Sequence, residues 1–142
     1  MASSNVWSHI SPDYVGSGEI TVIKCVATAD DSNDFLDEVI PTDLTKLVQG
    51  MYLHSFITVP DGTTAPDDNT DFVLNDSNSE DLLGGTGLNA IDNATIRHFF
   101  PQTDSVKMSR PIFDEVMTQV LTDNSTADAI TNIYYIFTKQ QR

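Results

Sequence analysis

The run Asp76-Ser77-Asn78-Ser79-Glu80-Asp81 places oxygen-bearing side chains at alternating positions, as a calcium-binding loop does. An EF-hand loop also requires glycine at its sixth position and a bidentate glutamate at its twelfth, and these positions hold Asp81 and Gly87. The run is therefore not an EF-hand. Ligands for a calcium site of another kind are nonetheless present at Asp67, Asp68, Asp71, Asp76 and Glu80. The interpretation that we favour is a cluster of acidic surface turns without a metal.

Residues that could act as nucleophiles, bases or zinc ligands are scattered along the chain. His9, His54 and His98 are too far apart in sequence for a zinc-ligand spacing. Cys25 is the only cysteine and lies in an apolar run, which is typical of a thiol that packs as a small hydrophobe. No serine lies in a Gly-x-Ser-x-Gly turn, and Gly84-Gly85-Thr86-Gly87 indicates a hinge because no Lys-Ser/Thr follows it. We expect no catalytic, cofactor-binding or metal-binding residue, and hence no enzyme.

The composition narrows the class of protein further. A length of 142 residues is typical of one domain. The 21 acidic and 7 basic residues give a net charge of −14, which repels nucleic acid and favours basic partners. No apolar run approaches the ~20 residues needed to cross a bilayer, and the N-terminal residues lack the basic and apolar regions of a signal peptide. We therefore expect partners other than nucleic acid or a membrane.

β-Branched and aromatic residues recur in short runs that are bounded by turn residues. The predicted strands cover residues 19–29, 51–59, 71–75, 111–121 and 130–139, although the spacing over 111–121 also fits a helix. Residues 35–50 indicate strand fragments with a short helical turn capped by Thr42, residues 89–101 are helical or extended, and residues 106–108 form a short strand. Seven or eight strands with turns every ~8–12 residues predict an all-β fold, an antiparallel β-sandwich like a jelly roll.

The first part of the chain differs from the rest. Residues 1–18 are polar with scattered apolar side chains, which predicts an extended N-terminal arm before a single sandwich domain over residues 19–142. Such an arm either folds over its own domain or reaches a neighbouring subunit, and a partly ordered terminus is the alternative. Trp7 is the expected anchor because tryptophan gives a large contact area at a low entropy cost. The candidate interface residues are Trp7, Tyr14 and Val15.

Four motifs occupy the middle of the chain. They are Gly50-Met51-Tyr52-Leu53, Thr58-Val59-Pro60-Asp61-Gly62-Thr63-Thr64-Ala65-Pro66, Asp68-Asn69-Thr70-Asp71-Phe72-Val73-Leu74-Asn75-Asp76 and Asp81-Leu82-Leu83-Gly84-Gly85. Together they resemble the motifs of a group of small virion proteins of tailed bacteriophages, which also close with a β-hairpin like the one predicted over residues 112–138. One departure is Asp61, which precedes Gly62 where the family pattern has glycine directly after proline.

The resemblance implies a non-enzymatic structural component of a virion that is assembled in the host cytoplasm. A decoration or cement protein bound to the major capsid protein of the assembled shell is the first expectation, and a head–tail junction or tail component is the alternative. Either role implies a homo-oligomer in a symmetric particle. Two alternatives come from other classes: a carbohydrate- or calcium-dependent ligand-binding module, and a DNA-mimic inhibitor.

Overall fold

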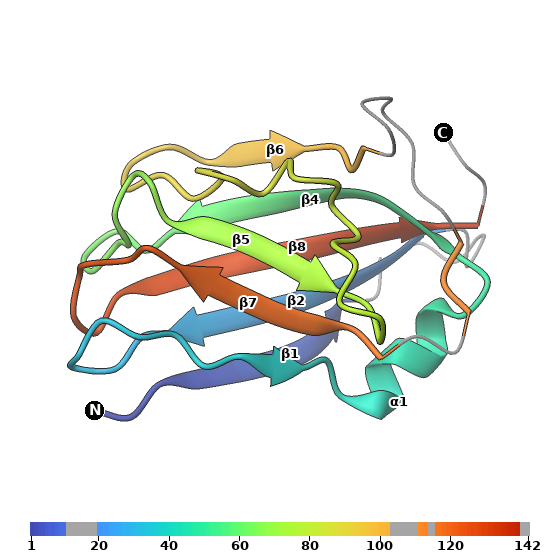
Figure 1. Ribbon diagram of the computed structural model, residues 1–142, viewed down its shortest axis with the longest axis horizontal. Helices are drawn as coiled ribbons and strands as arrows, with labels where there is room; N and C mark the ends of the chain where they lie inside the picture. Colours follow the sequence, from blue (N-terminus) through green and yellow to red (C-terminus); the bar gives the residue numbers. More distant parts are fainter. Residues whose placement is uncertain (11–19, 103–110, 114–115, 140–142) are drawn as a thin grey trace.

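The computed structural model describes residues 1–10, 20–102, 111–113 and 116–139, and its strands form two antiparallel sheets. The large sheet has the order β1 (Ser4–Ile10), β2 (Ile20–Thr28), β8 (Ile130–Thr138), β4 (Tyr52–Pro60) and β6 (Arg97–Phe99). The small sheet has the order β3 (Glu38–Val39), β7 (Thr118–Thr122) and β5 (Asp71–Asn75). Figure 1 shows β5 and β7 in front of the large sheet. The predicted all-β sandwich is confirmed.

Aromatic rings fill the space between the two sheets. Phe72 of β5 meets Phe56 of β4 edge-on at 5.2 Å and Tyr135 of β8 at 5.8 Å, measured between ring centroids. All three side chains are fully buried. The alternation of the strands brings them together, because every second residue of a strand faces the same side of its sheet. These rings tie the large sheet to the small one.

Most strand predictions hold, and one is wrong in extent. β2, β4, β5 and β8 lie where strands were predicted, and β6 shows that residues 89–101 include an extended segment. The strand predicted over residues 111–121 begins only at Thr118. Pro111 has no N–H donor, and Ile112 exchanges backbone hydrogen bonds with Gly50 and Met51 at the end of the core instead. The strand predicted over residues 106–108 lies outside the described residues.

Residues 35–50 contain β3 followed by two helical turns, α1 (Thr42–Thr45) and η1 (Lys46–Val48). The prediction of Thr42 as N-cap is wrong. The carbonyl oxygen of Pro41 accepts from the N–H groups of Leu44 and Thr45 at 2.9 and 3.1 Å, so the helix begins one residue earlier, and no side chain caps it. Gly50 follows the helical turns with φ of +76°, a conformation that glycine adopts without steric cost.

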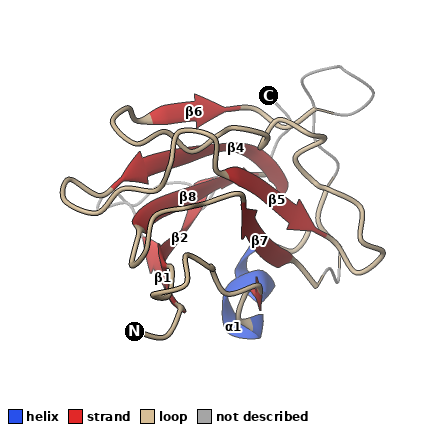
Figure 2. Ribbon diagram, turned by 60° about the vertical axis from the view of Figure 1, so that its left-hand side comes forward, coloured by secondary structure: helices blue, strands red, loops and turns tan. Residues whose placement is uncertain are grey.

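Residues 4–10, which the sequence places in an extended arm, form the outer strand of the large sheet. Their register with β2 is continuous from Ser4 opposite Thr28 to Ile10 opposite Val22. Figure 2 shows β1 and β6 at opposite margins of this sheet, with the N-terminus beside β1. The predicted boundary between residues 18 and 19 lies outside the described residues.

The hinge predicted at Gly84-Gly85 is a tightly packed turn. Both glycines have positive φ, and a Cβ atom on Gly84 would collide with the carbonyl oxygen of Gln102. The N–H of Gln102 in turn donates to the carbonyl oxygen of Leu83 at 3.1 Å. These contacts fix the turn against the segment that follows β6.

Candidate binding surface

The large sheet carries no carboxylate. None of the 21 acidic residues of the chain occurs in β1, β2, β4, β6 or β8, and the charged residues of these strands are Lys24 and Arg97. The acidic residues that the structure describes lie in loops and turns, in α1, and in the small sheet at Glu38 and Asp71. The negative charge is therefore distributed unevenly over the molecule.

The outer face of the large sheet is largely apolar. The strand registers align residues that point away from the core, and the apolar ones among them are half-buried or exposed: Val6, Val22, Val26, Ile57, Val59, Tyr134 and Ile136. Ser8, Lys24 and Asn132 lie on the same face. Val6 on β1 has 62% of its surface exposed. The ammonium group of Lys24 lies 5.3 Å from the ring centroid of Tyr134, which places the one charge of β2 against an aromatic face.

Three of the four sheet margins are short or covered. β3 has 2 residues and β6 has 3, including the charged Arg97. The backbone of β5 is covered by its own chain, since Phe72 N–H donates to the carbonyl oxygen of Gly87 and Leu82 N–H donates to that of Leu74, both at 2.8 Å. These are the usual devices that keep a sheet margin from pairing with another chain.

The fourth margin, β1, lacks these protections. It has 7 residues, none of which is proline, lysine, arginine, aspartate or glutamate, and its register with β2 contains no bulge. Within the described residues, its strand partner is β2, and no backbone hydrogen bond is found on the other side of Ser4–Ser8. Such a strand presents N–H and C=O groups that another extended chain can pair with.

Side chains of β1 bond to β3 and to the segment that precedes it. The amide of Asn5 donates to the carbonyl oxygen of Leu36 at 3.0 Å, and the indole N–H of Trp7 donates to Glu38 at 3.2 Å. The ring of Trp7 also stacks on Tyr135 at 6.3 Å. Trp7, a candidate interface residue, therefore packs half-buried within its own chain, and a contact with a partner stays a prediction.

The other two candidate interface residues, Tyr14 and Val15, lie outside the described residues. No sequence pattern indicates the residues that connect β1 to the interior, because their partners are far apart along the chain. The hydroxyl of Tyr135 donates to Gln119 at 2.5 Å, and the amide of Gln119 donates to Asn5 and Cys25, both at 3.4 Å. This buried network joins β1, β2, β7 and β8.

The network has the properties of a structural core and not of an active site. Burial raises the pKa of the Cys25 thiol to about 12. The hydrogen bond from Gln119 lowers this pKa by less, and the charge of Glu38 adds a smaller increase. Burial also raises the pKa of Tyr135 well above its ordinary value. A thiol with so high a pKa is not a nucleophile near neutral pH. The interpretation of Cys25 as a small hydrophobe agrees with these properties.

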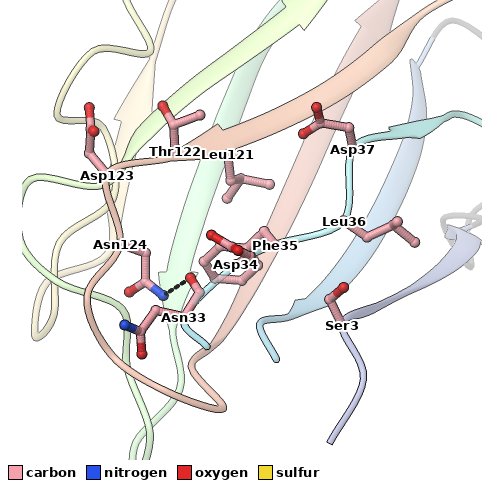
Figure 3. A pocket seen from close by; sticks show the side chains of 10 residues that line it. All are labelled: Ser3, Asn33, Asp34, Phe35, Leu36, Asp37, Leu121, Thr122, Asp123 and Asn124. Atoms are coloured by element: carbon pink, nitrogen blue, oxygen red, sulfur yellow. Dashed lines mark hydrogen bonds between the residues drawn. The ribbon is translucent and has the colours of Figure 1, made fainter. Parts of the chain in front are cut away.

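A cavity of about 460 Å³ opens where β1 begins. Ser3, residues 33–37 and residues 121–124 line it. Figure 3 shows Phe35 and Leu121 toward its middle and Asp37 and Asp123 at separate places on its rim, with Asn124 bonded to the backbone of Asn33 at 2.9 Å. Phe35 and Leu121 are buried and form an apolar floor, whereas the side chains of Asp34, Asp37 and Asp123 are exposed.

The carboxylates proposed for a calcium site do not converge. Asp67 accepts from Ser125 and Thr126, Asp68 from the N–H of Asn93, Asp71 from that of Asn89, and Asp76 from those of Asn78 and Glu80. Asp76 thus stabilises its own turn, and the other three each join their loop to a different segment of the chain. In the described part of the chain, no three His, Cys, Asp or Glu side chains come close enough to hold a metal.

Hydrogen bonds from backbone and hydroxyl groups stabilise the charged form of several of these aspartates. The pKa of Asp67 is lowered mainly by the Ser125 hydroxyl, and those of Asp61 and Asp92 mainly by the backbone N–H groups of Thr63 and Ala94. Asp61 and Asp92 close the turns that contain them, whereas Asp67 joins its loop to the loop of Ser125 and Thr126.

His54 and His98 both contact the ring of Phe100, and His9 lies apart from them. The Nδ1 atom of His54 lies 3.0 Å from the Ser55 hydroxyl, and the His54 ring meets Phe100 edge-on at 5.5 Å. His98 lies against another side of Phe100 at 4.9 Å, and His9 is on β1 at the opposite margin of the sheet. His54 therefore has the packing of a structural histidine.

None of the helices in the described ranges is long and apolar enough to cross a membrane. Comparisons with protein-family models, with curated proteins and with solved structures find no match for this chain.

Proposed function

We propose that this protein is a non-enzymatic structural component of a phage virion, which binds neighbouring subunits of the shell as a decoration or cement protein. The observation that carries the proposal is the acid-free large sheet in a chain of net charge −14. The resemblance of the motifs in residues 50–85 to small virion proteins supplies the setting, and the major capsid protein is the proposed partner.

The charge distribution suits a protein that must adhere in many copies. Two surfaces that both carry excess negative charge repel each other, and desolvating their carboxylates costs free energy. The outer face of the large sheet avoids both costs because it has valine, isoleucine and tyrosine side chains and no carboxylate. Burial of such a face contributes roughly 25 cal/mol for each Å² of apolar surface removed from water.

The buried network supports a structural function as well. The polar side chains that lie inside the sandwich bond to one another between strands, and the thiol among them is unreactive near neutral pH. They contribute to holding β1 and the two sheets together. A protein built this way keeps one shape in every copy, which a symmetric shell requires.

Co-sedimentation with purified shells tests the proposal. Shells stripped of the protein are mixed with the wild-type chain and with two variants, Val26→Glu and Val73→Glu. Val26 lies on the outer face of the large sheet, and Val73 is a half-buried valine on β5 of the small sheet, so the two variants add the same charge to opposite sides. Circular dichroism establishes that both variants are folded.

We expect the wild-type and Val73→Glu chains to sediment with the shells and Val26→Glu to bind at least about tenfold more weakly. Failure of the wild-type chain to bind shells would contradict the proposal, and binding at one vertex only would assign the chain to a head–tail junction. Equal losses in both variants would show that the large sheet is not the contact surface.

A further inference from the structure

We propose that the margin of β1 and the cavity beside it form one groove, which binds an extended, lysine- or arginine-containing segment of a neighbouring protein. The segment adds a strand to the large sheet next to β1 and places a basic side chain in the cavity. The inference rests on the proposed structural function, for which it names the chemistry of the neighbour.

The first support is the comparison of sheet margins. β1 alone among the four combines 7 residues with an unbroken register and has no proline, lysine, arginine, aspartate or glutamate. Within the described residues, no backbone hydrogen bond covers the outer side of Ser4–Ser8. The side-chain bonds of Asn5 and Trp7 keep it in place from within the sandwich. A partner strand therefore meets a margin that is already ordered, which lowers the entropy cost of pairing.

The second support is the position of the cavity. Ser3 belongs to its lining and directly precedes β1, and residues 33–37 form another of its walls. Asn5 bonds to Leu36 of that wall, so the wall lies alongside β1. Alternate side chains of a strand point to the same side. A strand added to β1 therefore directs every second side chain to the side of the sheet on which residues 33–37 lie.

The third support is the chemistry of the cavity. Its floor of Phe35 and Leu121 suits the methylene chain of a lysine or arginine, and the exposed carboxylates of Asp34, Asp37 and Asp123 suit the cationic end. The charge of −14 on the whole chain attracts a basic segment and opposes the approach of a second copy. These features select a basic partner over self-association.

A peptide-binding experiment with the full chain tests the groove. The probe is the acetylated heptapeptide Thr-Lys-Thr-Lys-Thr-Lys-Thr, with its fully N-methylated form and its glutamate analogue as controls. The N-methylated peptide keeps every charge but has no backbone donor, so it separates strand pairing from general electrostatic attraction. Binding is measured at about 0.15 M salt by amide chemical shifts and by the fluorescence of Trp7, the only tryptophan.

We expect saturable shifts at residues 4–10 and 33–37, and binding at least about tenfold weaker for both control peptides. The double variant Asp34→Asn/Asp37→Asn should weaken binding of the lysine peptide at least about fivefold. The matched variant Asp43→Asn/Glu80→Gln removes the same charge from exposed residues that do not line the cavity, and should change binding less than about twofold.

Three outcomes would refute the proposed groove: equal binding of the N-methylated peptide, equal effects of the two double variants, or no shift at residues 4–10. Pairing of β1 with a second copy that excludes the peptide would overturn it as well. If the peptide fails to bind while shells still capture the chain, the groove is refuted and the structural function stands. If the peptide binds and shells do not capture the chain, the proposed function is refuted instead.

Discussion

Tyr135 and Gln119 link the two sheets at the level of single residues. The hydroxyl of Tyr135 is fully buried, and its donor bond to the Gln119 side chain is short at 2.5 Å. Gln119 is fully buried too and donates onward to Asn5 and Cys25. A buried polar group that loses its partner keeps the cost of its desolvation, so each member of this network depends on the others.

Tyr135→Phe should lower the free energy of unfolding by about 1–3 kcal/mol, because the ring still packs while the Gln119 oxygen loses its donor. Urea denaturation measures the change. Tyr134→Phe is the matched control, since Tyr134 is the next residue on β8 and points to the outer face, where losing a hydroxyl should cost under about 0.5 kcal/mol. Equal effects of the two variants would refute a stabilising function of the network.

Asp67 should give the protein an acid-sensitive link between two loops. Hydrogen bonds from Ser125 and Thr126 lower the pKa of Asp67 below its ordinary value of 3.8, so the unfolded state binds the proton more readily. The stabilisation is therefore complete above that ordinary value and is lost as pH falls through the lower, folded-state pKa. The stability difference between the wild-type chain and Asp67→Asn should then shrink as pH falls from about 6 to about 2.5.

Urea midpoints across this pH range measure that difference. Glu80→Gln is a suitable control because it removes one negative charge from an exposed residue. A gap between the wild-type chain and Asp67→Asn that stays constant with pH would show that the contacts with Ser125 and Thr126 do not favour the charged carboxylate.

At the scale of elements, β1 combines a structural function with the binding function that we propose for it. It closes one side of the sandwich through Asn5 and Trp7, and its outer margin is the proposed contact for a partner strand. Removing it would turn β2 into the margin of the large sheet, with the whole length of its backbone exposed. β2 is a 9-residue strand rich in β-branched residues, which is the kind of margin that leads to aggregation.

Deletion of residues 1–10 should therefore destabilise the protein by more than about 3 kcal/mol and cause it to self-associate. Thermal unfolding and analytical ultracentrifugation measure the two effects. Deletion of residues 1–3 alone, which leaves β1 intact, is the control. A 1–10 deletion that unfolds at the wild-type temperature as a monomer would show that residues 4–10 are a dispensable arm.

The strand pattern of the sequence was informative where local signals were strong. β2, β4, β5 and β8 were predictable because alternating apolar residues end at clear turn residues. β7 was extended too far, since Pro111 and Ile112 pair with residues 50–52 through contacts that no local pattern reveals. The arm prediction failed to place β1 in the sheet for a similar reason, because its pairing with β2 depends on tertiary contacts.

The candidate site was less predictable than the fold. Trp7 could be identified as an anchor by its type alone, but its partners Tyr135 and Glu38 lie far along the chain. The cavity is assembled from three separate segments, and none of them has a motif. The asymmetry of charge was present in the sequence, and it became visible only once the acid-free strands were found to share one sheet.

At the scale of the whole molecule, negative charge is concentrated outside the large sheet. The repulsion among these carboxylates opposes the compact state, and salt screens it. The melting temperature should therefore rise as sodium chloride increases from about 0.01 to about 0.3 M, over which the Debye length falls from ~30 Å to under ~10 Å. Differential scanning calorimetry measures this, and a melting temperature that falls with salt would contradict net self-repulsion.

A cryo-electron microscopy reconstruction of the virus particle tests the central claim most directly. The account predicts density for the sandwich repeated across the shell, with the outer face of the large sheet and the β1 margin against neighbouring chains and the acidic loops toward solvent. A particle without this density would contradict the account, and so would contacts made by the acidic loops while the large sheet faces water.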